Sequence, residues 1–256
     1  MTIGEMKRRK QELGYSNARL SELSGVPLGT VQKVMGGSTS LPREETLRKL
    51  ENVLRKPGMV AESAEQYQVK KPGDYTLEDY LALPEERRVE MIDGVFYDMA
   101  APTTVHQAIG GFMYKQLLDF VMEQGGECMP FMSPVDVQLD CDEKTVVQPD
   151  VLIVCDRAKF RNGRVFGAPD FLAEVLSPST RKKDMSLKLY KYMNAGVREY
   201  WIIDPDKKAV IVYDLEHEAI PAVYGFDTEI PVLVWDGKCR ISFPLMMKTI
   251  GFLYET

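Results

Sequence analysis

The sequence lacks the features that mark membrane-spanning, secreted and small zinc-binding proteins. No apolar run approaches the roughly 20 residues that a transmembrane helix needs, and the N-terminal stretch MTIGEMKRRKQELG has no apolar segment of a signal peptide. The four cysteines, Cys128, Cys141, Cys155 and Cys239, form no C-x-x-C pair, which argues against a zinc knuckle or a dithiol redox motif. We therefore expect a cytoplasmic protein without a membrane segment, in which the thiols are reduced and buried.

Positive charge is concentrated near the N-terminus. Residues 1–56 contain eleven Lys and Arg against six Glu, whereas the rest of the chain carries a net charge of −11. Such an uneven distribution suggests a small basic module attached to an acidic body. The segment 57–73 contains two Pro-Gly breaks and no apolar periodicity. We expect it to be a linker, followed by a second domain over 74–256.

The N-terminal module has the pattern of short helices joined by tight turns. Ser16 or Asn17 can cap one helix, Gly25 supplies a turn, and Pro27 opens the next helix. A further helix is expected from Arg43 onward, because leucines then recur on one stripe. Two short helices around a glycine turn are typical of a helix-turn-helix.

The segment 3–55 resembles the helix-turn-helix domains of the Cro and phage-repressor class, with LSELSGV and TV around the turn. The resemblance implies a DNA-binding module whose second helix enters a major groove. That helix offers Thr30, Gln32 and Lys33 for contact with DNA and contains no arginine. A helical bundle for dimerisation or protein contact stays open as the alternative, although the net charge of +5 favours contact with phosphates.

From residue 74 the pattern becomes mixed. Asp93-Gly94 between alternating apolar residues predicts a hairpin, and residues 103–123 repeat apolar residues at helical spacing. The elements expected after them are strands at 134–139, 146–154 and 171–176, a helix capped by Ser179 or Thr180 and ending at 196, and strands at 199–204, 209–215 and 231–237. This order predicts an α/β (α+β) domain with a mixed sheet flanked by helices.

Several motifs of this module resemble signatures of the Uma-two family, which is assigned as restriction endonucleases within the PD-(D/E)xK nuclease superfamily. The matching stretches are EMIDG at 90–94, HQ at 106–107, PDVLIV at 149–154, PDFLAEVLSPSTRKKD at 169–184 and KLYKYMNAGVREYWIIDP at 188–205. The resemblance spans roughly residues 74–215. It implies a restriction-endonuclease-like fold and a metal-dependent DNA endonuclease.

Two acids lie where a buried strand would ordinarily carry Val or Ile. Asp150 opens one expected strand and Glu174 lies within the next, where an ionised carboxylate is costly unless a partner neutralises it. Phosphodiester hydrolysis needs a hard cation, and Mg²⁺ prefers a few carboxylates with several retained waters. We expect Asp150, Glu174 and the Val175 carbonyl to hold Mg²⁺, with Mn²⁺ as a substitute, and Glu90 to add a ligand or hold a metal-bound water. Each acid alone could instead lie on the wet face of a strand.

The superfamily pattern places a lysine two residues after the strand acid, where this chain has Leu176. The Uma-two pattern instead offers a lysine on the following helix, which here is Lys188. Asp184, Lys188 and Tyr192 are spaced four apart and so share one helix face. An ammonium group there would stabilise hydroxide and the charge that develops on the phosphate. The alternative is a solvated basic face, since other lysines lie nearby in the sequence.

His106, one of two histidines, stands at the start of the expected long helix. Imidazole suits softer metals than Mg²⁺, so we consider it a group that orients Glu90 or contacts the scissile phosphate. Capping or packing is an equally open role.

The sequence thus predicts a Mg²⁺-dependent endonuclease with its own DNA-reading head. A transcriptional regulator whose nuclease-like body oligomerises or binds a ligand is one alternative, and a metal-dependent hydrolase of RNA or a nucleotide is another. The presence of Asp150, Glu174 and Glu90 together favours the nuclease. We expect a homodimer acting on DNA, because cutting both strands of a palindrome needs two active sites.

Overall fold

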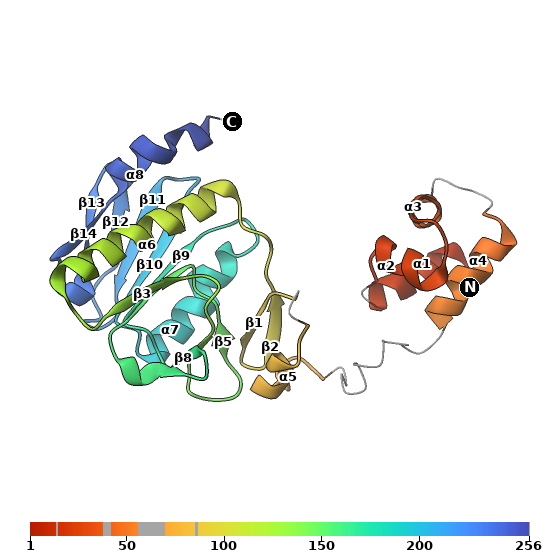
Figure 1. The fold of residues 1–256 in the computed structure, drawn as a ribbon, viewed down its shortest axis with the longest axis horizontal. Helices are drawn as coiled ribbons and strands as arrows, with labels where there is room; N and C mark the ends of the chain where they lie inside the picture. Colours follow the sequence, from red (N-terminus) through yellow and green to blue (C-terminus); the bar gives the residue numbers. More distant parts are fainter. Residues whose placement is uncertain (14, 38–41, 56–69, 85–86, 256) are drawn as a thin grey trace. The chain divides into compact units, whose positions relative to one another are not determined.

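The computed structural model describes residues 1–13, 15–37, 42–55, 70–84 and 87–255 (Figure 1). The chain divides into two compact units, Met1–Gln68 and Val69–Thr256. Most of the expected linker, 57–69, lies outside the described residues. Within the described ranges, no helix combines the length and the apolar character that a bilayer crossing requires.

The small unit is made of helices. They are α1 (Ile3–Glu12), α2 (Asn17–Ser24), α3 (Leu28–Gly36) and α4 (Glu44–Arg55). The Ser16 hydroxyl accepts a hydrogen bond from the Arg19 amide, which identifies Ser16 rather than Asn17 as the cap of α2. Gly25 ends α2 with φ 65°, a left-handed conformation that glycine adopts without steric cost, so the tight turn before α3 is confirmed. The unit has its own core of Met6, Leu20, Val26, Val31, Val34, Met35, Leu50 and Leu54.

A six-stranded mixed sheet forms the centre of the large unit, in the order β12-β11-β10-β9-β6-β3. Its strands are β3 (Met129–Met132), β6 (Val151–Val154), β9 (Phe171–Val175), β10 (Glu199–Asp204), β11 (Ala209–Asp214) and β12 (Ala222–Gly225). Strands β9 and β10 are parallel, with Glu174 opposite Ile202, and the other pairs are antiparallel.

A second sheet has the order β2-β1-β5-β4-β8-β7. Its strands are β1 (Val89–Ile92), β2 (Val95–Asp98), β4 (Val137–Gln138), β5 (Val146–Val147), β7 (Phe160–Arg161) and β8 (Arg164–Phe166). The predicted Asp93-Gly94 hairpin joins β1 and β2, and both turn residues have positive φ. A separate hairpin of β13 (Glu229–Val232) and β14 (Cys239–Ser242) precedes α8 (Phe243–Ile250), and α5 (Leu77–Leu81) opens the unit.

Two helical segments cover opposite faces of the central sheet (Figure 1). Helix α6 (Thr104–Gln124), close to the predicted span, packs over the face that carries Ala173 and Val175. A π-helical turn (Lys183–Lys188) leads into α7 (Leu189–Ala195), which packs on the face that carries Leu172. Because side chains alternate along a strand, Glu174 shares the face of Leu172 and points toward the π-turn and α7.

The run 146–154, expected to be one strand, is divided between the two sheets. Strand β5 belongs to the second sheet and β6 to the central sheet, and Gln148-Pro149-Asp150 connects them. Proline cannot donate a ladder hydrogen bond, which explains the break. The division leaves Asp150 at the junction of the two sheets, immediately before β6.

Other predicted boundaries also change. The strand at 134–139 is reduced to the two residues of β4, and the run at 231–237 continues from β13 into a 3-10 turn, Leu233–Trp235. The helical segment after β9 begins at Arg181, and the Thr180 carbonyl accepts the hydrogen bond of the Asp184 amide at 2.9 Å. Of the two predicted caps, Thr180 therefore directly precedes the helix and Ser179 does not, while the Ser177 hydroxyl caps the preceding turn by accepting a hydrogen bond from the Thr180 amide.

The expectation of reduced, buried cysteines is wrong for three of the four. Cys128 and Cys155 form a disulfide beside the neighbouring strands β3 and β6. Cys141 is a free, exposed thiol, and Cys239 is free and buried. The mistake arose because the cysteines are separated by 27 residues along the chain, and only the strand pairing brings them together.

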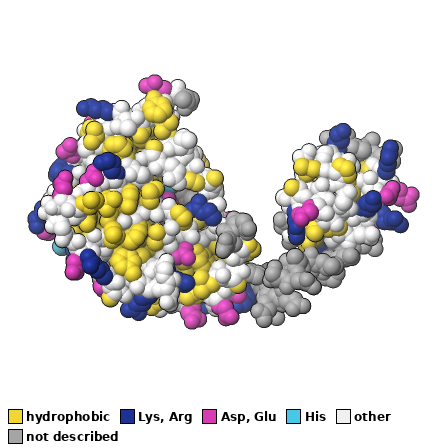
Figure 2. Space-filling view, viewed as in Figure 1, with side chains coloured by type: hydrophobic (Ala, Val, Ile, Leu, Met, Phe, Trp, Pro, Cys, Tyr) yellow, Lys and Arg dark blue, Asp and Glu magenta, His cyan; other side chains and the backbone are white. Residues whose placement is uncertain are grey.

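Hydrophobic side chains gather on the face of the large unit drawn in Figure 2, in the region of α6 and β3. Met122, Met129 and Phe160 are 72%, 46% and 39% exposed, and they line a shallow hollow there together with Leu118 and Phe131. Exposed apolar patches of this kind commonly mark contact surfaces.

Candidate active site

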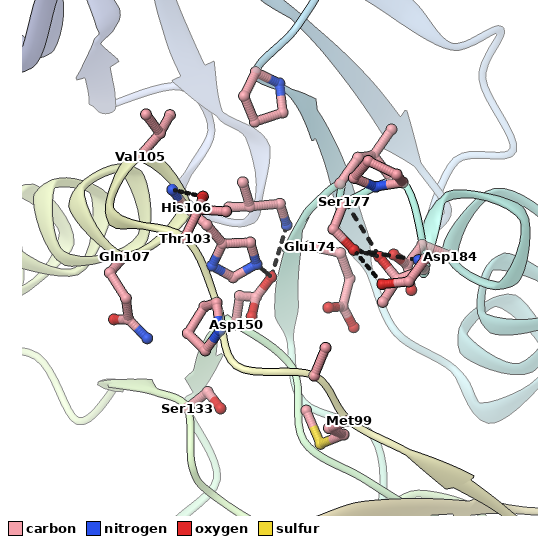
Figure 3. A pocket seen from close by; sticks show the side chains of 18 of the residues that line it. Met99, Thr103, Val105, His106, Gln107, Ser133, Asp150, Glu174, Ser177 and Asp184 are labelled. Atoms are coloured by element: carbon pink, nitrogen blue, oxygen red, sulfur yellow. Dashed lines mark hydrogen bonds and ion pairs between the residues drawn. The ribbon is translucent and has the colours of Figure 1, made fainter. Parts of the chain in front are cut away.

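A pocket of about 560 Å³ lies where the two sheets, the start of α6 and the π-turn meet (Figure 3). The residues predicted for catalysis and metal binding all line it: Glu90, His106, Asp150, Glu174, Val175 and Lys188. They come from five separate segments of the chain. The fold therefore brings the whole predicted set together. Thr30, Gln32 and Lys33 belong to α3 of the other unit, where Gln32 and Lys33 are exposed and Thr30 is partly buried.

Lys188 lies at the centre of a cluster of buried carboxylates. Its Nζ is 2.6 Å from Glu90 Oε1, 2.8 Å from Glu174 Oε1 and 3.8 Å from Asp184 Oδ1. The Tyr192 hydroxyl donates a second hydrogen bond to Glu174 Oε1, at 2.6 Å. The side chain of Lys188 is only 3% exposed, so the alternative of a solvated basic face is excluded. The predicted shared face of Asp184, Lys188 and Tyr192 is confirmed.

The π-turn explains how two lysines reach the same carboxylate. Residues five apart on an α-helix point about 140° away from each other, since each residue turns the helix by about 100°. A π-helix closes its hydrogen bonds between residues five apart and so aligns them more nearly. Lys183 Nζ thus donates to Glu90 Oε2 at 2.5 Å, while Lys188 contacts Oε1 of the same side chain.

Asp150 is fixed by the neighbouring strand and by α6. Its Oδ2 accepts a hydrogen bond from the Val175 amide at 2.8 Å and lies 3.0 Å from His106 Nε2. The Thr103 hydroxyl caps α6 by accepting a hydrogen bond from the His106 amide, which places the imidazole at this end of the helix. His106 therefore contacts Asp150, and the interpretation that it orients Glu90 is wrong.

The ionisation of the cluster follows from burial and from its charges. Burial, aided by the negative charges of Asp150, Asp184 and Glu90, raises the pKa of Glu174 to about 8 against the opposing effect of Lys188. Burial also acts to raise the pKa of Glu90, but Lys188 and Lys183 outweigh it and hold that pKa below its usual value. Glu90 is thus the ionised partner of the lysines, and Glu174 is the carboxyl that holds a proton most readily.

For the cationic members of the cluster, burial acts to lower the pKa and the neighbouring carboxylates act to raise it. Burial opposes the charge of Lys188, but the surrounding carboxylates raise its pKa well above the ordinary lysine value. Burial likewise opposes the charge of His106, and the hydrogen bond and charge of Asp150 outweigh it, so the pKa of this imidazole is raised. Lys188 accordingly stays an ammonium group over the whole neutral range.

The donor set fits a hard divalent cation with few protein ligands. Five carboxyl groups line the pocket against three basic side chains and the titratable His106: Glu90, Asp150, Glu174, Asp184 and Asp206 against Arg88, Lys183 and Lys188. Asp184 is 2% exposed, and its Oδ1 has no hydrogen-bond partner. Among the described residues, no group of three or more His, Cys, Asp or Glu side chains is placed so that together they could hold a metal ion. A metal in this pocket would therefore have few protein ligands, as Mg²⁺ does when it keeps much of its water.

Sequence reasoning missed Lys183, which it counted among the nearby lysines of a solvated basic face. It also overlooked Gln148, whose backbone amide donates a hydrogen bond to Glu90 Oε1 at 3.1 Å and whose side-chain Nε2 donates one to Asp136 Oδ1. The backbone turn at Pro149 gives Gln148 this position, and the expected continuous strand concealed it. Leu176, where the superfamily has a lysine, is 5% exposed and packs in the core beneath α7.

Comparisons with known proteins agree with this architecture. Residues 77–233 match the model of the Uma-two family (Uma2), described as "Putative restriction endonuclease". The uncharacterized protein slr1290 of Synechocystis is 26% identical over 139 residues, which cover 53% of this chain and 72% of that relative. A crystal structure described as a "putative nuclease belonging to DUF820" from Anabaena variabilis superposes with a TM-score of 0.57 at 23% identity, covering 68% of this chain and 97% of that one.

The likeness in structure establishes the fold, a mixed α+β arrangement of the restriction-endonuclease-like type, with a small helical N-terminal unit beside it. The family match covers more than half of the chain and includes every residue of the pocket cluster around Lys188. The chain belongs to the Uma-two family of nucleases.

Proposed function

We propose that the protein is a metal-dependent DNA endonuclease. The observation that carries the proposal is the excess of carboxylates around Asp150 and Glu174, beside the Val175 backbone, in one pocket. Asp150, Glu174 and the Val175 carbonyl would hold Mg²⁺, for which Mn²⁺ would substitute. When bound, the metal supplies Lewis-acid stabilisation of the phosphate and a more acidic water.

The other residues of the pocket have positioning and electrostatic roles in this proposal. His106 fixes the orientation of Asp150 through the 3.0 Å contact. The ammonium group of Lys188 lies 2.8 Å from Glu174 Oε1 and holds that carboxyl in place. Glu90 anchors that ammonium and, in the proposal, holds a water of the metal.

We further propose that the small unit reads DNA as a helix-turn-helix. The exposed side chains of Gln32 and Lys33, with Thr30, lie on the helix that follows the Gly25 turn, and the net charge of residues 1–56 favours phosphates. A homodimer in the cytoplasm completes the proposal, and the apolar patch over α6 and β3 offers a surface for the second copy. Light scattering that gives a stable monomer at micromolar concentration would exclude the dimer.

The decisive test compares the wild type with Asp150→Ala on supercoiled plasmid, over a titration of Mg²⁺ and of Mn²⁺. We expect nicked and linear products from the wild type only in the presence of metal, and none from the variant at the same metal concentration. Binding of plasmid without cleavage in either metal would instead support a DNA-binding regulator with an inactive nuclease-like body. Cleavage of RNA in preference to DNA would point to the third candidate, a metal-dependent RNA hydrolase.

A further inference from the structure

The two lysines of the π-turn differ in how much freedom they have. Lys188 is 3% exposed and has three carboxylates within 4 Å, two of them at 2.6 Å and 2.8 Å. Lys183 is 15% exposed, and Glu90 is its carboxylate partner among the described residues. Both lysines line the pocket. Lys183 alone of the two can turn toward a ligand without leaving a group of buried carboxylates behind.

The surroundings of Lys183 hold it ready at the pocket wall. Glu90 Oε2 accepts one of its protons at 2.5 Å, and the ring of Tyr97 on β2 lies 5.4 Å from Nζ. The carboxylate fixes the ammonium in place and the ring faces it without removing a donor, since an aromatic face attracts a cation but accepts no strong hydrogen bond. Two of its three N–H groups therefore remain for a ligand.

Lys188 cannot serve the same purpose at equal cost. Moving its ammonium toward the pocket would remove the 2.6 Å and 2.8 Å contacts to Glu90 and Glu174, both of which are buried. Removing a cation from buried carboxylates is strongly unfavourable. The position of Lys188 suits a group that holds the carboxylates in place.

We propose that Lys183 is the catalytic lysine that contacts a non-bridging oxygen of the reacting phosphate, and that Lys188 is a positioning residue for Glu90 and Glu174. The inference rests on the proposed nuclease function and assigns the phosphate-contacting group within it. A lysine recognises phosphate as a point charge, and in this role Lys183 keeps its proton throughout. Glu90 then has two distinct tasks, with Oε1 facing Lys188 and Oε2 aiming Lys183.

The test uses the full-length protein with Lys183→Gln, Lys183→Arg and the control Lys182→Gln, which removes an exposed charge from the same helix. In single-turnover cleavage of supercoiled plasmid at saturating Mg²⁺, Lys183→Gln should lose about 10²–10³-fold in rate, the loss typical for one electrostatic stabiliser. Lys183→Arg should retain part of the rate. The Mn²⁺ affinity of Lys183→Gln by calorimetry should match that of the control, and its melting temperature should fall less than that of Lys188→Met, because Lys188 still neutralises Glu90.

A second readout does not depend on cleavage. The salt dependence of binding to a short DNA duplex in Ca²⁺ should weaken by about 0.9 in the log–log slope when Lys183 loses its contact with a phosphate. Lys183→Gln that cleaves as fast as the control and keeps the wild-type slope would overturn the proposal. A fall in Mn²⁺ affinity that matches the fall in rate would also overturn it, because Lys183 would then act only as the counter-ion of Glu90.

The nuclease activity and the role of Lys183 are tested separately by these measurements. A wild type that cleaves no DNA in Mg²⁺ or Mn²⁺ contradicts the proposed nuclease activity, and the duplex-binding slope still decides whether Lys183 contacts a phosphate. A wild type that cleaves normally, with an unaffected Lys183→Gln, contradicts only the assignment of Lys183.

Discussion

The small and large units use charge in opposite ways. In the small unit, ion pairs such as Arg19–Glu22 and Lys49–Glu45 lie on the surface, with side chains 41–69% exposed. Every charged residue that is buried among those described belongs to the large unit: Glu90, Glu174, Asp184, Lys188, Glu199 and Asp204. Exposed pairs contribute little to stability and produce a diffuse field, whereas buried charges are costly and interact strongly. Net charge on a surface therefore indicates the kind of partner, whereas buried charge indicates a functional site.

Replacing Lys188 should lower the stability of the large unit and leave that of the small unit unchanged. Lys188→Met leaves Glu90, Glu174 and Asp184 without their shared cation, which should destabilise the unit by about 3–5 kcal/mol at neutral pH. Calorimetric melting should show one transition lowered and the other unchanged, with partial recovery in Mn²⁺. The matched control is Lys115→Met, whose 67% exposed ammonium pairs with Asp119, and it should change stability by less than about 0.5 kcal/mol. Equal melting temperatures of the two variants would contradict the role of Lys188 as the cation that the buried carboxylates share.

Replacing Glu199 tests whether burying a carboxylate lowers the free energy of unfolding. It is 1% exposed on β10 and accepts hydrogen bonds from Trp201 Nε1 and the Val234 amide. Burial raises its pKa to about 7 from an ordinary value of 4.5. The folded state therefore holds this proton more tightly than the unfolded state. The stability that Glu199 contributes is complete below about pH 4.5 and is lost as pH rises through about 7.

Glu199→Gln should remove that pH dependence. The free energy of unfolding of the variant minus that of the wild type should therefore rise by on the order of 3 kcal/mol as pH increases from about 4.5 to 8, because the pKa is shifted by about 2.5. Urea unfolding over this pH range measures the gain. Glu229→Gln, at a side chain 58% exposed, is the control and should follow the wild-type curve. If the difference between Glu199→Gln and the wild type does not vary with pH, the carboxyl is ionised in the folded protein.

The pocket acids should affect metal affinity more than the stability of the fold. Asp150→Asn and Glu174→Gln keep the shape of each side chain but remove an anionic oxygen donor. We expect Mn²⁺ affinity to fall by at least about 100-fold, the upper range for groups that merely support a metal ligand. Calorimetry of Mn²⁺ binding decides this, with Asp136→Asn as a control on the neighbouring hydrogen-bond network of Tyr80 and Gln148. Unchanged affinity in both variants would leave the proposed metal site without a basis.

The smallest effect is expected on the surface of the small unit. Lys33→Ala should weaken binding to DNA duplexes of any sequence to a similar degree and reduce the salt slope by about 0.9. Fluorescence anisotropy over a range of salt concentrations measures the slope. Lys49→Ala, on α4 and paired with Glu45, serves as the control. A wild-type slope in Lys33→Ala would remove α3 from the proposed DNA contact.

Local signals predicted much of the fold. The Asp93-Gly94 turn, the long helix α6 and the strands β9 and β10 follow from turn chemistry and periodicity, which act over a few residues. The division of 146–154 was not recognised, because its apolar residues continue on both sides of Pro149. The disulfide and the second sheet depend on contacts between distant segments, which periodicity does not contain.

The candidate site was predicted more completely than the boundaries of its elements. Asp150 and Glu174 stood out because an acid within an apolar strand is costly, and that cost is visible in the sequence. Lys183 did not stand out, because its role depends on a helical turn of unusual pitch. The partner of His106 was also hidden, since it depends on how the start of α6 meets the strand after Pro149.

The π-turn also has a consequence for how this site is encoded. Both lysines reach Glu90 because the segment Lys183–Lys188 contains one residue more than an α-helical turn would use for the same advance. Deleting a single uncharged residue there, such as Ser186, would leave every acid and lysine in the chain and still swing Lys183 away from Glu90. The site therefore depends on the spacing between the two lysines as much as on their identities. A sequence comparison that scores only identities would not detect the loss of that spacing.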